Sequence, residues 1–128
     1  MIAVDISGTI FSGIYVSLTK DKTDTVSEDF LRYIILNSIK SINHKFSPKY
    51  GKMVLCGEGK NNWRKDLYPS YKANRKFETK PGGPNWGEIF QSVRTIVQEI
   101  VDNLPYRYIA VPHAEADDCI GVIARRFL

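Results

Sequence analysis

The stretch from Trp86 to Asp118, WGEIFQSVRTIVQEIVDNLPYRYIAVPHAEADD, contains the pattern that decides the fold. Its first part carries apolar residues at steps of three and four until Pro105 ends the run, which predicts a helix from Trp86 to Leu104. The apolar run Tyr108–Val111 predicts a short strand, and Pro112–Asp118 then opens a final helix. A helix followed by a buried strand is part of the repeating unit from which parallel sheets are built.

Two earlier apolar runs extend the same pattern toward the N-terminus. Ile2–Asp5 (IAVD) and Lys52–Cys56 (KMVLC) each predict a short buried strand. We expect one helix from Thr9 to Leu18 and a second from about Ser27 to Ile42, where Thr25–Glu28 (TVSE) has the form of a capping box. Strands that alternate with helices predict an α/β fold in which helices flank a parallel sheet.

Composition limits the class of protein. A chain of 128 residues with 43% hydrophobic and 25% charged residues fits one small globular domain. Cys56 and Cys119 lie in separate apolar stretches, which indicates two buried thiols in a reducing compartment and no zinc site. Asp5 interrupts the first apolar run, and no later run approaches the roughly 20 residues that span a bilayer. We therefore expect a cytoplasmic protein that does not bind a membrane.

Acidic side chains follow all three predicted strands, and they are Asp5, Glu58 and the group Glu115, Asp117 and Asp118. Because ligands of open α/β sheets bind at the carboxyl ends of the strands, we expect these side chains to converge there. Clustered carboxylates repel one another, whereas Mg²⁺ or Mn²⁺ takes hard oxygen ligands and relieves the repulsion. The sequence therefore predicts a divalent metal site at this edge of the sheet.

Each acidic group also has a structural explanation to be weighed. Acids in the first turn of a helix stabilise its dipole, which alone would account for 115–118. Glu58 lies between two glycines, where a solvated Glu is ordinary. Asp5 fits such an explanation less well, since a carboxylate directly after three apolar strand residues is costly to bury unpaired.

The segment 60–80 combines basic and aromatic side chains, and its net charge of +5 exceeds the +4 of the whole chain. Cations neutralise phosphates and aromatic rings stack on bases, so the segment predicts a nucleic-acid ligand, with single strands favoured over duplex. The predicted binding residues are Trp63, Arg64, Lys65, Lys72, Arg75 and Lys76. Lys72 and Arg75 would project together from a helix expected after Pro69 and form a phosphate clamp beside the metal. The alternative is a solvated loop whose aromatic side chains pack on the body of the domain.

Together these motifs resemble the phage and bacterial 5′-to-3′ exonucleases and flap endonucleases. The resemblance rests on AVD ending at Asp5, LRYIILNSIK at 31–40, VLC before Glu58, WRKDLYPSYKANRK at 63–76 and AEADDCIGV at 114–122. It implies a PIN-like, Rossmann-like parallel sheet with flanking helices. It also implies phosphodiester hydrolysis with two Mg²⁺ ions about 3.5–4 Å apart, with Mn²⁺ as a possible substitute.

The resemblance assigns roles to individual residues. Those matching the metal-binding acids of the family are Asp5, Glu115, Asp117 and Asp118. Tyr71, Lys72 and Arg75 match the arch or clamp that holds the 5′ end, and are expected to be catalytic, with Lys72 and Arg75 stabilising charge on the scissile phosphate. The implied role is removal of RNA primers or 5′ flaps during phage DNA replication in the host cytoplasm, together with replication proteins.

Two features depart from the family pattern. The family usually has Asp where this chain has Glu58, whose side chain is one methylene longer. The family also continues into a strand that carries a pair of aspartates and pairs beside the first strand, and then into a helical DNA-binding region. We therefore expect residues 1–128 to be the N-terminal part of such a domain, truncated after the third strand and the following helix, with 60–80 as the arch.

Three functions stay open at this point. The first is the N-terminal portion of a metal-dependent nuclease that is active on RNA/DNA hybrids or branched DNA only with the missing C-terminal half. The second is a remnant that binds nucleic acid without cutting it. The third is a stand-alone PIN-like ribonuclease.

Overall fold

The strands form one small parallel sheet in a computed structural model that describes residues 1–21, 26–75 and 83–127. Its strands are β1 (Ile2–Asp5), β2 (Met53–Cys56) and β3 (Arg107–Ile109), in the order β1-β2-β3. β1 pairs with β2 from Ile2–Met53 to Asp5–Cys56, and β2 pairs with β3 in the same direction. The α/β fold with a parallel sheet, predicted from the alternating pattern, is confirmed.

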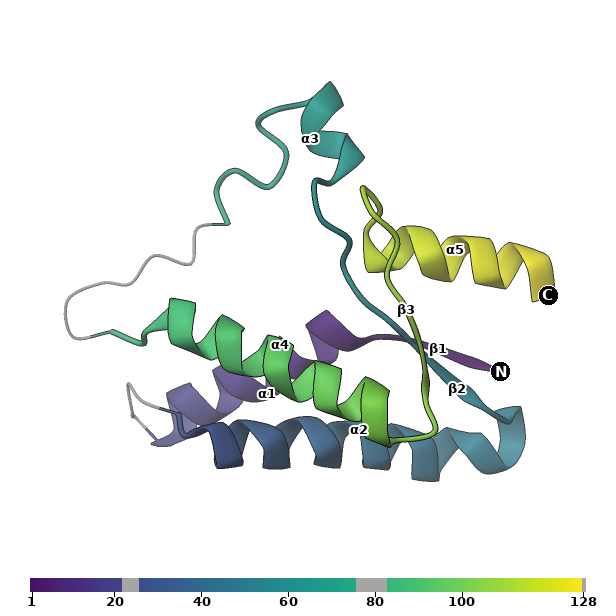
Figure 1. Ribbon diagram of the computed structural model, residues 1–128, viewed down its shortest axis with the longest axis horizontal. Coiled ribbons are helices and arrows are strands. Elements are labelled where there is room, and N and C mark those ends of the chain that lie inside the picture. Colours follow the sequence, from purple (N-terminus) through teal and green to yellow (C-terminus); the bar gives the residue numbers. More distant parts are fainter. Residues whose placement is uncertain (22–25, 76–82, 128) are drawn as a thin grey trace.

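Helices cover both faces of the sheet (Figure 1). Those in the described residues are α1 (Ile6–Asp21), α2 (Glu28–Tyr50), α3 (Trp63–Leu67), α4 (Trp86–Asn103) and α5 (Ala116–Phe127). α1, α2 and α4 lie on one side, α5 lies on the other, and α3 stands apart above the carboxyl ends of the strands. No helix in the described ranges is long and apolar enough to cross a lipid bilayer.

Alternation along the strands divides the core in two. Val4, Met53 and Leu55 face a large cluster that α1, α2 and α4 complete, with Ile10, Ile14, Ile35 and Ile96 almost fully buried. Val54 and Cys56 face the other side, where they meet Ala116 and Cys119 of α5. Both cysteines are buried and free, as predicted.

α2 extends beyond its predicted end at Ile42. Phe46 and Tyr50 continue the four-residue spacing of Ile42, so the helix reaches Tyr50 with Pro48 inside its last turn. Gly51 then ends it with a positive φ of 83°, and its N–H donates to the Ser47 carbonyl oxygen. α1 is also longer than predicted, because it begins directly after the strand.

The helix predicted after Pro69 is wrong. Residues 69–74 form turns, held by hydrogen bonds from Ala73 N to Ser70 O at 3.1 Å and from Arg75 N to Lys72 O at 3.0 Å. Lys72 has a φ of 54°, which lies in the left-handed region and prevents a regular right-handed helix. The short helix α3 lies earlier in the segment instead. Lys76 lies outside the described residues.

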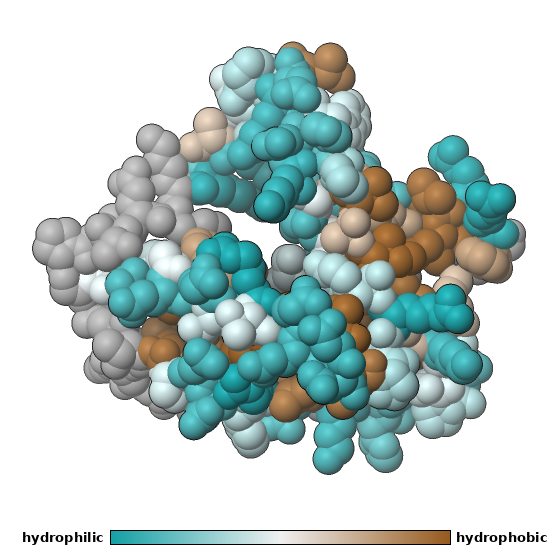
Figure 2. Space-filling model, viewed as in Figure 1, coloured by the Kyte–Doolittle hydropathy of each residue, from teal (hydrophilic) through white to brown (hydrophobic). Residues whose placement is uncertain are grey.

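β1 lies at an edge of the sheet, and apolar hollows flank it. One of about 630 Å³ is lined by β1 together with Ile42, Phe46 and Tyr50 of α2. Another of about 340 Å³ is lined by Ala3, Tyr50 and the α5 face that includes Ile120 and Ile123. The space-filling view shows hydrophobic surface around α5 and hydrophilic surface over most of the α3 region (Figure 2).

Candidate functional site

One pocket of about 530 Å³ lies where the strands end, and we call it the acidic pocket. Four of its lining residues are acids predicted from the strand ends, namely Asp5, Glu58, Glu115 and Asp117. The predicted phosphate-binding and catalytic residues Tyr71, Lys72 and Arg75 line it as well. The structure therefore brings seven of the predicted residues around a single hollow, although they come from four separate parts of the chain.

Asp5 stands at the carboxyl end of β1 and also begins α1. Its Oδ1 accepts a hydrogen bond from the Gly8 backbone N–H at 3.0 Å, which is the contact of an N-cap residue. The side-chain hydroxyl of Thr9 donates to the Asp5 carbonyl oxygen at 2.9 Å. Both strand pairing and capping fix this carboxylate at the pocket wall, so its structural role does not remove it from the pocket.

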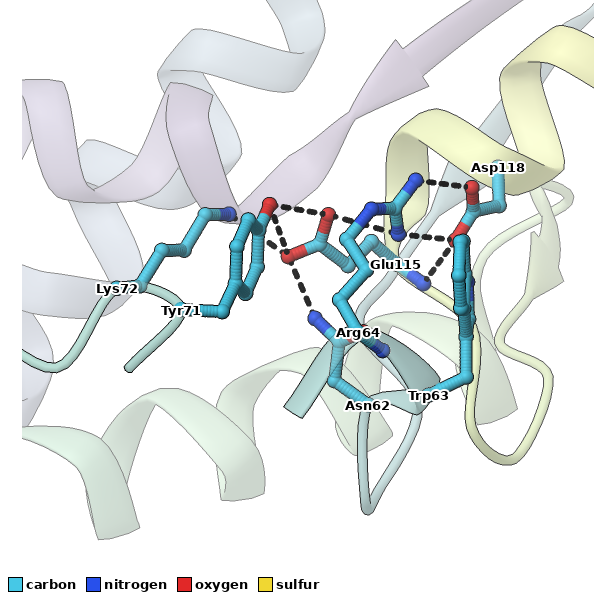
Figure 3. Close-up of polar contacts among 7 residues, drawn as sticks. All are labelled: Asn62, Trp63, Arg64, Tyr71, Lys72, Glu115 and Asp118. Atoms are coloured by element: carbon cyan, nitrogen blue, oxygen red, sulfur yellow. Dashed lines mark hydrogen bonds and ion pairs between the residues drawn. The ribbon is translucent and has the colours of Figure 1, made fainter. Parts of the chain in front are cut away.

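Glu115 is the buried acid of the site, with 6% of its surface exposed. Its Oε1 accepts hydrogen bonds from Lys72 Nζ and from Asn62 Nδ2, both at 2.7 Å (Figure 3). Its Oε2 lies 3.1 Å from an Arg64 guanidinium nitrogen and 3.2 Å from the Tyr71 hydroxyl. Burial alone would raise the pKa of the Glu115 carboxyl, but Lys72 and these other donors lower it below its ordinary value.

Asp118 binds within the protein rather than at the pocket. Arg64 holds both carboxylate oxygens, at 2.7 and 2.8 Å, in a bidentate pair. Asp118 also accepts the backbone N–H of Glu115 at 2.9 Å, which is the return contact of a capping box at the start of α5. The Arg64 guanidinium and this backbone hydrogen bond hold the pKa of the Asp118 carboxyl well below its usual range.

Two loops meet beneath these side chains, the one after β2 (57–62) and the one after β3 (110–115). Gly59 N donates to Ala114 O at 2.9 Å, His113 N to Lys60 O at 2.7 Å, and Trp63 N to His113 O at 2.9 Å. The His113 ring nitrogen Nδ1 lies 2.8 Å from the carbonyl oxygen of Asn61. These contacts join the start of the basic segment to the start of α5, and so place Arg64 opposite Asp118.

Gly59 allows this close approach. A Cβ atom at this position would lie 1.8 Å from the carbonyl oxygen of Val111, which belongs to the backbone and cannot move aside. The crowding requires glycine here, whatever the φ angle of the residue.

Glu58 and Asp117 complete the acidic side of the pocket. Burial raises the pKa of the Glu58 carboxyl, and a hydrogen bond from the Ala116 backbone N–H partly offsets this effect. Asp117 is exposed at the start of α5. Oxygen ligands of this kind are those that Mg²⁺ prefers, so the donor chemistry fits the predicted metal. Within the described ranges, however, no three His, Cys, Asp or Glu side chains are arranged to hold one ion.

Lys72 pairs with Glu115, and the other predicted nucleic-acid residues differ in their accessibility. Lys65 and Arg75 are exposed, and Trp63 is 43% exposed, so all three are accessible to a ligand. Arg64 instead stacks on the Trp63 ring at 4.5 Å and pairs with Asp118. Lys76 lies outside the described residues.

Sequence reasoning missed Asn62, which belongs to the hydrogen-bond network around Glu115. Its side-chain oxygen accepts the Arg64 N–H at 2.9 Å and caps α3, while its amide nitrogen binds Glu115. Asn directly before a short helical segment is an N-cap signal that was available in the sequence.

Comparison with known proteins identifies the family of the chain. Residues 1–128 match the family model of the 5′-3′ exonuclease, N-terminal resolvase-like domain. The chain is 30% identical over 107 residues to the ribonuclease H of Enterobacteria phage T4, which covers 81% of this chain and 35% of that protein. It is 36% identical over 95 residues to the exonuclease of Escherichia phage T7, covering 73% of this chain and 29% of that protein. A 5′-3′ exonuclease of Streptomyces coelicolor is 28% identical over 95 residues, covering 72% of this chain and 32% of that protein.

These matches confirm the resemblance drawn from the sequence motifs. The chain spans about a third of the length of the curated relatives that it matches.

The close approach at Gly59 gives a first prediction. Gly59→Ala forces the two loops apart and should lower the free energy of unfolding by roughly 1–3 kcal/mol. Gly121→Ala is the matched control, because its Cβ would meet nothing within 4 Å and it lies inside α5. The free energy of unfolding of Gly121→Ala should rise by roughly 0.5–1 kcal/mol. Urea unfolding of both variants checks this; equal effects would contradict the tight loop contact.

The lowered pKa values of Asp118 and Glu115 predict how the stability of the fold depends on pH. A carboxyl whose pKa is lower in the folded chain stabilises that state fully above its ordinary pKa, and the stabilisation is lost as the pH falls toward the folded value. The free energy of unfolding should therefore decline below about pH 4. Asp118→Asn should show a shallower decline, whereas the exposed-site control Asp102→Asn should follow the parent. Identical curves for Asp118→Asn and the parent would refute the role of the Arg64 pair.

Proposed function

Because the chain belongs to the family of 5′-3′ exonuclease N-terminal, resolvase-like domains, which are nuclease domains, we propose that it takes part in 5′-3′ nuclease cleavage. It binds divalent cations and the scissile phosphate of the nucleic-acid substrate. The observation that carries this proposal is the acidic pocket. It combines four carboxylates with Lys72 and Arg75, and so offers ligands for cations and for a phosphate within one hollow.

The carboxylates would hold the cations. Asp5 is fixed by strand pairing and capping, Glu115 by burial at the start of α5, and Glu58 and Asp117 lie between them on the pocket wall. Bound Mg²⁺ supplies charge neutralisation at the phosphate and activates water for hydrolysis. Asp118 takes a supporting role in this proposal, because its pair with Arg64 orients the first turn of α5.

The basic side of the pocket would hold the substrate. Lys72 and Arg75 present their charges to the same hollow, where a phosphate oxygen would accept hydrogen bonds from them. The exposed Lys65 and Trp63 extend the cationic and aromatic surface beyond the pocket, which suits an unpaired strand. We take the substrate class to be 5′ flaps and RNA primers on DNA; this choice, and a role in phage replication, rest on the resemblance to the family.

The open edge of β1 supports a further part of the proposal. A strand added beside β1 would cover the hollows lined by α2 and α5 and would end at the acidic pocket. Side chains at that end would supply further metal ligands. The greater length of the relatives is consistent with such a segment.

A second candidate is a domain that binds nucleic acid without cutting it. Two observations favour it: cations already neutralise Glu115, and the described residues hold no group of three acids arranged for one ion. Cleavage distinguishes the two candidates, since both of them bind.

The nuclease proposal predicts that Asp5→Asn separates cleavage from binding. Asn retains the helix cap but loses the charge, so hydrolysis of a 5′-flap substrate with Mg²⁺, measured with the complementary segment of a relative added, should fall at least about tenfold. Binding of the same substrate with no metal present should persist. Asp102→Asn, which removes an acid far along α4, should cleave like the parent.

Two results would count against the proposal. Unchanged cleavage by Asp5→Asn would remove Asp5 from the metal site. A parent chain that binds the flap but never cleaves it, with Mg²⁺ or Mn²⁺ and with the complementary segment of a relative added, would favour the non-cleaving candidate.

A further inference from the structure

The Glu115 carboxylate has no capacity left for a metal ion. An ionised carboxylate offers about four lone-pair sites. Here Lys72 and Asn62 occupy Oε1, while Arg64 and Tyr71 occupy Oε2. Any cation that used Glu115 would first have to displace one of these four donors.

Two of the four donors are restrained by other contacts, and a third is uncharged. Arg64 is held by both oxygens of Asp118 and by the Trp63 ring. Asn62 caps α3 through its side-chain oxygen, so its amide cannot turn away without loss of the cap. The Tyr71 hydroxyl is neutral and competes only weakly with a divalent charge.

Lys72 differs from these donors. Its side chain is 36% exposed, and its ammonium lies at the end of a flexible four-carbon stem. Beyond Glu115, its ammonium lies near the Tyr71 ring, whose centroid is 5.1 Å away. The ammonium faces the acidic pocket, which Arg75 also lines, so a phosphate that entered the pocket would offer it a second anionic partner.

We propose that the Lys72 ammonium is an exchangeable counter-ion of Glu115, which a nucleic-acid phosphate draws away so that the carboxylate becomes free for a divalent cation. The inference rests on the proposed nuclease function. In the metal-free chain Lys72 neutralises the buried acid and stabilises it. When a phosphate takes Lys72, the cation takes its place, so the pocket remains neutralised in both states.

Cooperative binding follows from this exchange. If a phosphate raises the affinity of the site for a cation, the cation must raise the affinity for the phosphate by the same factor. Neither ligand then has to break the Lys72–Glu115 pair alone when the other is already bound. A chain without nucleic acid would hold metal weakly.

Calorimetry with the full chain tests the proposal. Mg²⁺ affinity is measured alone and with saturating single-stranded oligodeoxythymidylate, with Ca²⁺ in place of Mg²⁺ wherever the oligonucleotide is cleaved. The oligonucleotide should raise metal affinity by roughly 5-fold to 150-fold in the parent. Lys72→Met keeps the length of the side chain and removes its charge, so without nucleic acid it should bind metal more tightly than the parent. The ratio of its metal affinities with and without the oligonucleotide should be close to one.

Lys65→Met is the matched control, since it removes an exposed lysine of α3 that does not line the pocket. The oligonucleotide should raise the metal affinity of this variant by the same factor as in the parent. Circular dichroism confirms that each variant is folded, and the parent measurement tests the proposal without any substitution.

The outcomes separate this inference from the proposed function. If the parent binds both ligands with a factor of one, or if Lys72→Met keeps the full factor, the exchange is refuted while the nuclease proposal stands. If the parent binds neither the metal nor the oligonucleotide, both fall.

Discussion

The arrangement of the site depends on one buried charge, the carboxylate of Glu115. A buried carboxylate is very costly unless opposite charges and hydrogen bonds surround it. Its partners Asn62, Arg64 and Lys72 all come from the segment between β2 and α4, between 43 and 53 residues away in the chain. Satisfying Glu115 therefore folds the basic segment back over the start of α5, and this fold-back creates the acidic pocket.

Two ion pairs form where the basic segment meets the start of α5, and they differ in what surrounds them. Asp118 and Arg64 form a bidentate pair that also caps α5 and stacks on Trp63, so its contribution is structural. Lys72 and Glu115 form a pair that faces the pocket, where we propose that a phosphate and a cation compete for its two members. Under this proposal, the stability of the chain and its binding of ligands draw on the same contacts, which is common where a functional site is built from charged groups.

Hydrophobic periodicity predicted the strands, the parallel sheet and the helices α1, α2, α4 and α5, because burial of apolar faces dominates those choices; α3, which buries no residue, was not predicted. The order of strands and acids also predicted that Asp5, Glu58 and Glu115 reach one edge. Local backbone geometry was harder to predict from the sequence. The left-handed backbone conformation of Lys72 produces turns where a helix was expected. The partner of Arg64 could not be read from spacing either, since a guanidinium suits a carboxylate and a phosphate equally well, and only the loop contacts at Gly59 select Asp118.

A double-mutant cycle between Lys72 and Glu115 tests the central claim most directly. Lys72→Met, Glu115→Gln and the double variant are compared with the parent by urea unfolding in the absence of metal and nucleic acid. If the ammonium neutralises the buried carboxylate, the double variant is less destabilised than the sum of the two single variants by about 0.5 kcal/mol or more. Free energies that add within roughly 0.3 kcal/mol would show that the two groups do not interact, and would contradict the account.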